Sequence, residues 1–177
     1  MEVRAFACNM KQKQIATKIL FILYCLLIVW IVIFKTSFSF SDIAFLSAER
    51  RVNLIPFYYA DDVGRLHLRE VILNIIIFIP FGLYLRMLGT SIKKAIFTGA
   101  VTSLTLEVCQ FILAIGSFDI TDLITNTLGV IFGICFYALL GFVFKKRRTA
   151  DKIVNILFGI GIILFLSMAA VLFLANR

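Results

Sequence analysis

Residues 118–144 read FDITDLITNTLGVIFGICFYALLGFVF, a segment that begins with spaced polar residues and continues as an almost unbroken apolar run. The run is long enough to cross the hydrocarbon core of a bilayer, which takes about 20 predominantly apolar residues. Asp119, Asp122 and Asn126 follow one another at spacings of three and four, so a helix would place them on one face. The segment therefore predicts a membrane-spanning helix with polar groups at one end.

The remainder of the chain has the same apolar character. The protein has 177 residues, of which 62% are hydrophobic, and its mean hydropathy is +1.02. Soluble domains contain about 45–50% apolar residues, so the composition excludes an ordinary soluble protein. We predict an all-α integral membrane protein, a single membrane domain over residues 1–177. Its five transmembrane helices are expected at about residues 17–36, 70–88, 94–115, 121–144 and 153–174.

The basic residues are unevenly distributed between the loops. Twelve of the 18 Lys and Arg residues lie before the first helix, between the second and third, or between the fourth and fifth. The positive-inside rule then places the N-terminus in the cytoplasm and the C-terminus outside. It also places the loop between the first two helices outside, where Phe57, Tyr58 and Tyr59 are expected to form an interfacial anchor. The net charge of +8 suits anionic membrane lipids and requires no nucleic acid.

In this orientation, polar residues from three helices reach the same depth near the outer surface. Glu107 lies about 18 Å into a hydrocarbon layer about 30 Å thick. A carboxylate at this depth costs at least a few kcal/mol, so it is expected to face a cavity or a partner. The full set comprises Arg69, Glu70 and Asn74 on the second helix, Glu107 and Gln110 on the third, and Asp119, Asp122 and Asn126 on the fourth.

Each polar residue also has a structural interpretation. Glu107 could join two helices through a hydrogen bond, and Asp119 could cap the fourth helix with Asp122 as an acid in its first turn. Asn126 and Asn74 could form interhelical amide hydrogen bonds. Small residues favour close helix packing: Ala95, Gly99 and Ser103 on the third helix, and Gly129 and Gly133 on the fourth.

Recognised catalytic and cofactor motifs are missing. The four cysteines have no metal-type spacing, and no nucleophile, zinc or Walker motif occurs. We expect no cofactor, apart from a divalent cation if Glu107, Asp119 and Asp122 act together as oxygen ligands.

Four segments together resemble the VanZ-like family: RRVNLIPF (50–57), LREVILNIIIFIPFGLYL (68–85), SLTLEVCQF (103–111) and AIGSFDITDLITNTLGVIFG (114–133). The resemblance spans about residues 50–140 and implies a multi-pass protein of the bacterial plasma membrane. It also implies lower susceptibility to teicoplanin-type glycopeptides, without remodelling of the D-Ala-D-Ala terminus of the wall precursor. The motif positions are Asn53, Pro56, Asn74, Phe78, Pro80, Gly82, Glu107, Gln110, Asp119, Asp122, Asn126 and Gly129.

This chain departs from the family pattern at one point. Many family members have an arginine just before the first aspartate, where this chain has Gly116 and Ser117. A model in which that arginine binds phosphate would therefore need Arg65 or Arg69 instead.

Three functions remain open. The leading hypothesis is a non-enzymatic membrane factor whose outer polar pocket binds a membrane lipid, a lipid-linked wall precursor or the glycopeptide antibiotic. Its ligand-binding candidates are the polar residues of the three helices together with Asn53. The second is an enzyme acting on lipid or polyprenyl-phosphate headgroups, with Glu107, Asp119 and Asp122 as catalytic candidates and a carboxylate-held divalent metal. The third is a scaffold for a cell-wall enzyme, with a protein partner that the sequence does not identify.

Overall fold

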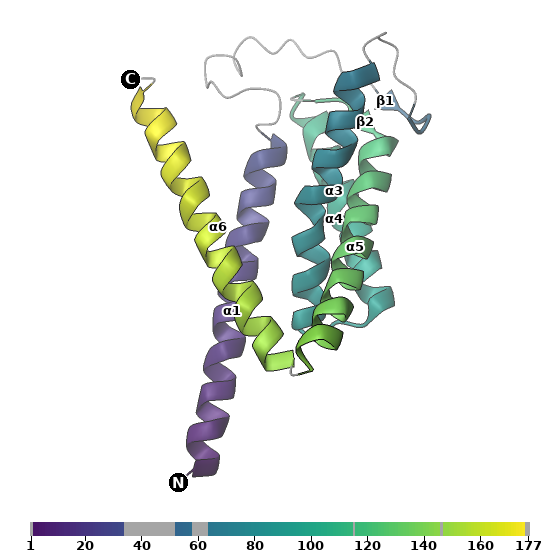
Figure 1. Ribbon diagram of the computed structural model, residues 1–177. Helices are drawn as coiled ribbons and strands as arrows, with labels where there is room; N and C mark the ends of the chain where they lie inside the picture. Colours follow the sequence, from purple (N-terminus) through teal and green to yellow (C-terminus); the bar gives the residue numbers. More distant parts are fainter. Residues whose placement is uncertain (1, 34–51, 58–63, 115, 146, 176–177) are drawn as a thin grey trace. The chain divides into compact units, whose positions relative to one another are not determined.

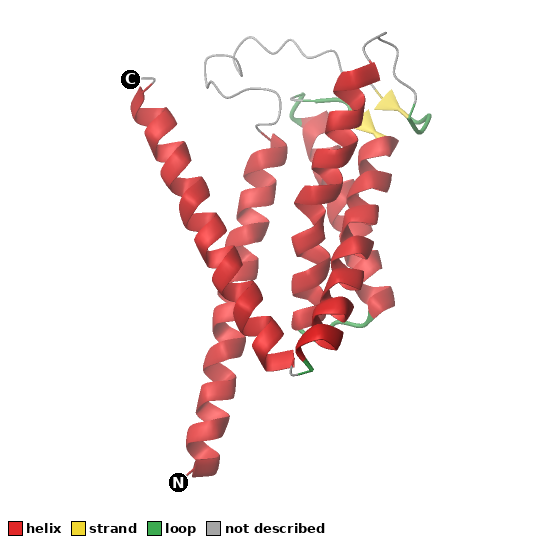
Figure 2. Ribbon diagram, in the orientation of Figure 1, coloured by secondary structure: helices red, strands yellow, loops and turns green. Residues whose placement is uncertain are grey.

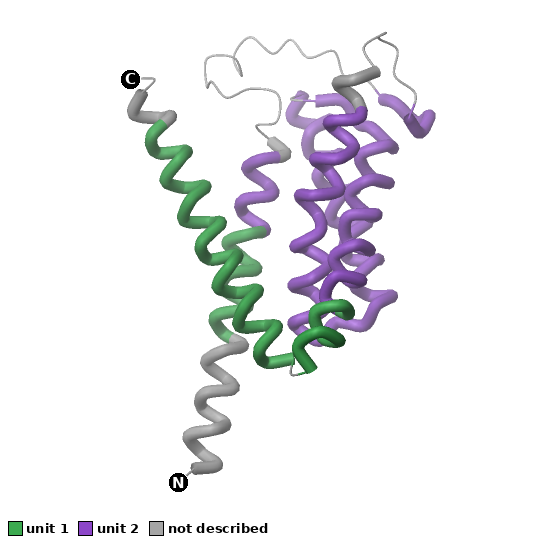
Figure 3. Tube along the Cα trace, viewed as in Figure 1, with its two compact units in different colours: residues 1–24, 138–177 green, residues 25–137 purple. Residues whose placement is uncertain are grey.

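The computed structural model describes residues 2–33, 52–57, 64–114, 116–145 and 147–175 (Figure 1). In these ranges the chain forms five α-helices and two very short strands (Figure 2). Their contacts divide it into two compact units, residues 1–24 with 138–177 and residues 25–137 (Figure 3). The elements are α1 (Glu2–Ile33), β1 (Val52–Asn53), α3 (Gly64–Met87), α4 (Ile92–Ile112), β2 (Phe118–Asp119), α5 (Ile120–Phe144) and α6 (Arg147–Ala175).

The prediction of a helical membrane protein is confirmed at this level. Four segments are long and apolar enough to cross a membrane: Leu68–Met87, Ile92–Ile112, Ile120–Phe144 and Arg147–Val171. In α1 the apolar part, Ile15–Ile31, is shorter. The direction in which the chain crosses the membrane stays a prediction, and Tyr58 and Tyr59 lie outside the described residues.

Several helices extend beyond the predicted transmembrane ranges. α1 begins at Glu2, α3 at Gly64 and α6 at Arg147, before the predicted spans at 17, 70 and 153. Hydrophobicity determines which residues can lie in hydrocarbon, but a helix continues into water wherever its residues favour it. Ala, Met, Lys, Arg, Gln and Glu are good helix formers, and they are frequent in the early parts of α1 and α6.

In residues 25–137, α3 and α5 approach each other so closely that glycines of each helix lie against the backbone of the other. A Cβ built on Gly129 would lie 2.4 Å from the carbonyl oxygen of Ile75, and one on Gly133 would lie 1.9 Å from that of Ile79. On α3, a Cβ on Gly82 would lie 2.1 Å from the Val130 oxygen. The expected close packing at Gly129 and Gly133 is confirmed, and any side chain there would separate the helices.

The predicted small-residue stripe on α4 is also confirmed as a buried face. Its buried residues are Ala95, Gly99, Ser103, Leu106, Glu107 and Gln110. The opposite face exposes large apolar side chains, including Phe97, Val101 and Val108. Exposed apolar side chains are expected where a spanning helix meets lipid, whereas a polar buried face needs partners within the bundle.

The two strands were not predicted. They pair in parallel, with Val52 opposite Phe118 and Asn53 opposite Asp119. The strands lie at the end of the α3–α4–α5 bundle where α5 begins (Figure 2). The pairing ties the residues before Leu54 to the start of α5, so part of the region that we expected to be only a loop is ordered against the bundle.

The second unit, residues 1–24 with 138–177, has its own polar and aromatic contacts. Asn155 Nδ2 donates a hydrogen bond to Thr17 Oγ1 over 2.8 Å, which joins α6 to α1. The rings of Tyr24 and Phe158 pack edge to face, with centroids 5.9 Å apart. Most apolar side chains on the rest of α6 are exposed, as expected for a helix surrounded by lipid.

Candidate functional site

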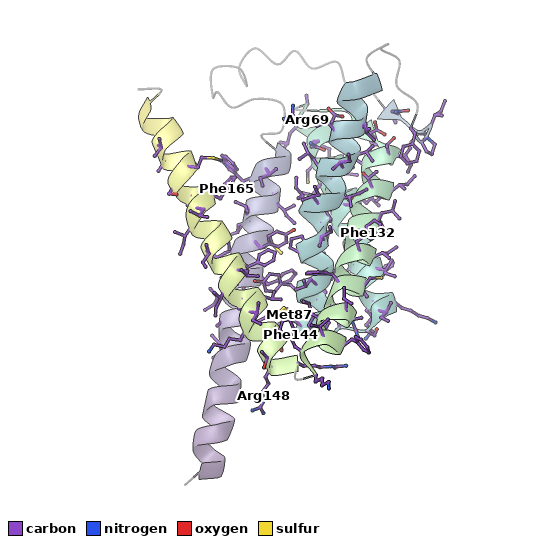
Figure 4. All side chains as sticks on the ribbon, in the orientation of Figure 1. Arg69, Met87, Phe132, Phe144, Arg148 and Phe165 are labelled. Atoms are coloured by element: carbon purple, nitrogen blue, oxygen red, sulfur yellow. The ribbon has the colours of Figure 1, made fainter. Side chains whose placement is uncertain are left out.

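Buried and half-buried polar side chains from α3, α4, α5 and the two strands meet near the start of α5. We call this group the polar cluster. It comprises Asn53, Asn74, Ser103, Glu107, Asp119, Thr121, Asp122 and Asn126, which the hydrogen bonds described below connect in smaller groups. Figure 4 shows the side chains that fill the bundle.

Asp119 organises the first group. Its Oδ1 accepts a hydrogen bond from the backbone N–H of Thr121 over 2.7 Å, which is the geometry of a helix N-cap. Its Oδ2 accepts a hydrogen bond from Asn53 Nδ2 over 3.2 Å. The capping interpretation of Asp119 is therefore confirmed, and the same carboxylate also holds β1 in place.

Glu107 binds the backbone at this cap. Its Oε2 accepts a hydrogen bond from the backbone N–H of Asp119 over 2.9 Å, and its side chain is only 1% exposed. A hydrogen bond from a backbone amide compensates part of the cost of burying a carboxyl group. Glu107 thereby connects the last turns of α4 to the residue that precedes α5.

Asn74 and Asp122 connect α3 to α5. Asn74 Nδ2 donates a hydrogen bond to Asp122 Oδ1 over 2.7 Å. Asp122 lies in the first turn of α5, where the helix macrodipole favours a negative charge. Asn74 is buried and Asp122 is half-buried, so part of the aspartate remains accessible.

One turn deeper, Asn126 and Ser103 connect α5 to α4. Asn126 Nδ2 donates a hydrogen bond to Ser103 Oγ over 2.9 Å, and both side chains are buried. The Oδ1 atom of Asn126 has no hydrogen-bond partner among the described residues. The interhelical amide interpretation therefore applies to both Asn74 and Asn126.

Two predicted members lie outside the cluster. Arg69 and Glu70 are exposed on α3, and no hydrogen bond or ion pair is described for their side chains with any other described residue (Figure 4 labels Arg69). Asn74 faces Asp122, the third residue of α5, and α3 runs parallel to α5. Glu70, one turn earlier on α3, is exposed and makes no such contact with α5.

Gln110 is buried on the same face of α4 as Glu107. A Cβ on Gly116 would lie 3.6 Å from the Gln110 amide nitrogen, an ordinary contact. The position where many family members have arginine is therefore packed against Gln110 in this chain.

Sequence reasoning missed two members of the cluster, Ser103 and Thr121, and the buried Thr125 one turn further along α5. Ser103 was assigned only to close packing, and Thr121 and Thr125 were not considered. All three are fully buried, and Thr121 Oγ1 accepts a hydrogen bond from the backbone N–H of Phe57 over 3.1 Å. A signal was available, because Thr121, Thr125 and Gly129 repeat every four residues on α5, and Ser103 precedes Glu107 by one turn.

The three carboxylates do not form a metal site. Among the residues that the structure describes, no group of three or more His, Cys, Asp or Glu side chains could hold a metal ion. Glu107, Asp119 and Asp122 instead accept hydrogen bonds from three different donors. The ligand set required by a carboxylate-held divalent cation is thus not assembled here.

The helices α3, α4 and α5 are long and apolar enough to cross a membrane, and the polar cluster joins them at the end where α5 begins. These features are those of a helical integral membrane protein. Residues 21–145 match the VanZ/LLP1 family model, and the chain belongs to this family. Protein VanZ of Enterococcus faecium is 37% identical over 155 residues, which cover 85% of this chain and 89% of that protein. No solved structure matches the chain. The resemblance read from the sequence motifs is confirmed, and the matched region contains every member of the polar cluster.

Proposed function

We propose that this protein lowers the susceptibility of bacteria to teicoplanin-type glycopeptide antibiotics from within the plasma membrane. In this proposal the polar cluster binds the headgroup of a lipid or of a lipid-linked wall precursor at the outer face. Membership of the VanZ/LLP1 family supports the activity. The observation that carries the binding proposal is the convergence of carboxylates and amides from three helices and two strands at one end of the bundle.

The cluster has two layers with different roles in this proposal. Glu107, Ser103 and Asn126 are buried and hold the helices together. Asn53, Asp119 and Asp122 are half-buried, so they are the members that an external ligand can reach. The deeper layer would fix the position of the accessible one, as a preorganised binding site requires.

The chemistry of the accessible layer favours a ligand that donates hydrogen bonds. An ionised carboxylate accepts hydrogen bonds and cannot donate them. Asp119 and Asp122 therefore suit ligand groups that donate, such as sugar hydroxyls, amides or an ammonium group. A bare phosphate would meet repulsion from both aspartates, and the exposed Arg69 lies outside the cluster. The sugar and peptide portions of a wall precursor, or an amine-containing lipid, match these acceptors.

The test compares Asp122→Ala with the matched variant Glu70→Gln, which changes an exposed carboxyl group on α3. We expect the minimum inhibitory concentration of teicoplanin to fall to the level of cells without the protein for Asp122→Ala, and to stay unchanged for Glu70→Gln. Membrane levels of both variants are measured by immunoblotting.

Bound lipid is then extracted from purified wild-type and Asp122→Ala protein and identified by mass spectrometry. A lipid species enriched in wild type and lost from the variant would support the proposal. Full protection by well-expressed Asp122→Ala and Glu107→Ala proteins would refute it.

A further inference from the structure

Residues 54–57, the apolar tip, project beyond the strand pairing without being covered. Leu54, Ile55 and Phe57 are 64%, 60% and 54% exposed, and Pro56 between them is exposed as well. The segment has no charged residue and, apart from its backbone, no hydrogen-bonding group. Consecutive exposed apolar side chains on an ordered segment indicate an interaction surface.

Hydrogen bonds hold the tip in this exposed conformation. Asn53 Oδ1 accepts a hydrogen bond from the Ile55 N–H over 3.2 Å, forming a local Asx-type turn. The Phe57 N–H donates to Thr121 Oγ1, and Phe57 itself has φ of 58°, an uncommon conformation for a bulky residue. Such conformations persist only where the surroundings enforce them. The apolar tip is therefore held against the first turn of α5 by this hydrogen bond.

The hydrogen bond to Thr121 also fixes the depth of the tip. Thr121 is the second residue of the apolar segment Ile120–Phe144, so the Phe57 backbone lies level with the first turn of a membrane span. In a bilayer crossed by the candidate span Ile120–Phe144, an apolar side chain outside the bundle at that level would meet lipid. On α5, the exposed Leu128 lies seven residues after Thr121, on the same side of the helix, and continues the apolar exterior toward the membrane interior.

We propose that the apolar tip inserts into the lipid leaflet beside α5, with Leu54, Ile55 and Phe57 in contact with acyl chains. Lipid is favoured over a protein partner because the tip lies at the edge of the hydrocarbon layer, is continuous with lipid-facing side chains, and offers no side-chain polar group. This contact follows from depth and exposure alone, so it holds whatever the polar cluster binds.

Tryptophan fluorescence in lipid vesicles tests the insertion. The single native tryptophan is removed by Trp30→Phe, and Phe57→Trp or Leu54→Trp then reports on the tip. Ser117→Trp serves as an exposed polar control, and Phe132→Trp, on the exposed face of α5 (labelled in Figure 4), as a lipid-facing control. Each protein is reconstituted in phosphatidylcholine brominated at a shallow or a deep position of its acyl chain.

We expect blue-shifted emission from both tip positions and quenching by shallow bromines that exceeds the quenching at residue 117. Deep bromines should quench residue 132 more strongly than the tip. Emission typical of hydrated indole, with quenching by aqueous acrylamide equal to that at residue 117, would overturn the proposal. Protection from both bromine and acrylamide would overturn it too, because it would place the tip against protein. Two tip positions keep the test valid if one variant fails to fold.

Discussion

The closest contact between α3 and α5 gives a prediction with a calculable size. In Gly133→Ala, the new methyl carbon would lie 1.9 Å from the Ile79 carbonyl oxygen and 2.9 Å from the Leu83 amide nitrogen. Reaching an ordinary contact distance requires the two backbones to separate by about 1.5 Å. Neither obstacle is a flexible side chain, so the helices themselves must move.

The expected destabilisation follows from these distances. Overpacking a tight interface costs about 1–3 kcal/mol, and a backbone obstacle places this variant near the upper end. Alanine recovers about 1 kcal/mol through its higher helix propensity than glycine. We therefore expect a net loss of about 2 kcal/mol, which corresponds to a decrease in the unfolding midpoint on the order of 5 °C.

The assay is thermal unfolding of purified protein in detergent, followed by circular dichroism. The control is Gly141→Ala on the same helix, where a Cβ would meet nothing within 4 Å. The control should be as stable as wild type or slightly more stable. If Gly133→Ala unfolds at the same temperature as Gly141→Ala, the close backbone contact between α3 and α5 is wrong.

Three further predictions concern individual hydrogen bonds. Ser103→Ala removes the acceptor of the buried Asn126 amide, so we expect a loss of about 1–2 kcal/mol in the same unfolding assay. Thr121→Val removes the acceptor of the Phe57 N–H, and we expect faster hydrogen–deuterium exchange at residues 54–57 by mass spectrometry. Asn155→Leu removes the hydrogen bond to Thr17 but also a buried carbonyl oxygen that has no partner among the described residues, and because these effects oppose each other, stability should stay within about 1 kcal/mol of wild type.

The first two of these predictions have a matched control variant. Ser117→Ala changes an exposed serine and should leave stability unchanged, so equal unfolding temperatures for it and Ser103→Ala would contradict the first prediction. Thr127→Val removes a hydroxyl that donates to the Leu123 carbonyl of its own helix, and exchange at the tip should not respond. A drop of several degrees for Asn155→Leu would show that its amide contributes more than the one hydrogen bond described.

Much of the helical architecture could be predicted because its signals are local. Apolar length identifies a spanning helix without any tertiary information, and a spacing of four placed Ala95, Gly99 and Ser103 on one buried face. The same reasoning placed Glu107 in the interior. Helix ends outside the hydrocarbon layer depend on propensity and capping, which explains why α1 and α6 begin earlier than apolar length predicted.

The composition of the polar cluster was harder to predict because it depends on where neighbouring helices end. Glu70 and Asn74 share a helical face, but only Asn74 is buried and hydrogen-bonded to α5. The pairing of Val52–Asn53 with Phe118–Asp119 joins residues 66 positions apart and has no periodic pattern. Thr121 could not be recognised as an acceptor for Phe57 without that pairing.

The strand pairing has a consequence for how the chain is made. Asn53 leaves the ribosome long before Asp119, and α3 and α4 are synthesised in between. A nascent chain that ends before residue 119 therefore contains Glu107 without the amide that binds it and Asn53 without the carboxylate that accepts from it. Because a buried carboxyl group that lacks one of its hydrogen bonds is more costly in hydrocarbon, α4 should remain near the aqueous path of the translocon until α5 emerges. Arrested chains truncated on either side of residue 119 would then differ in how readily α4 crosslinks to lipid.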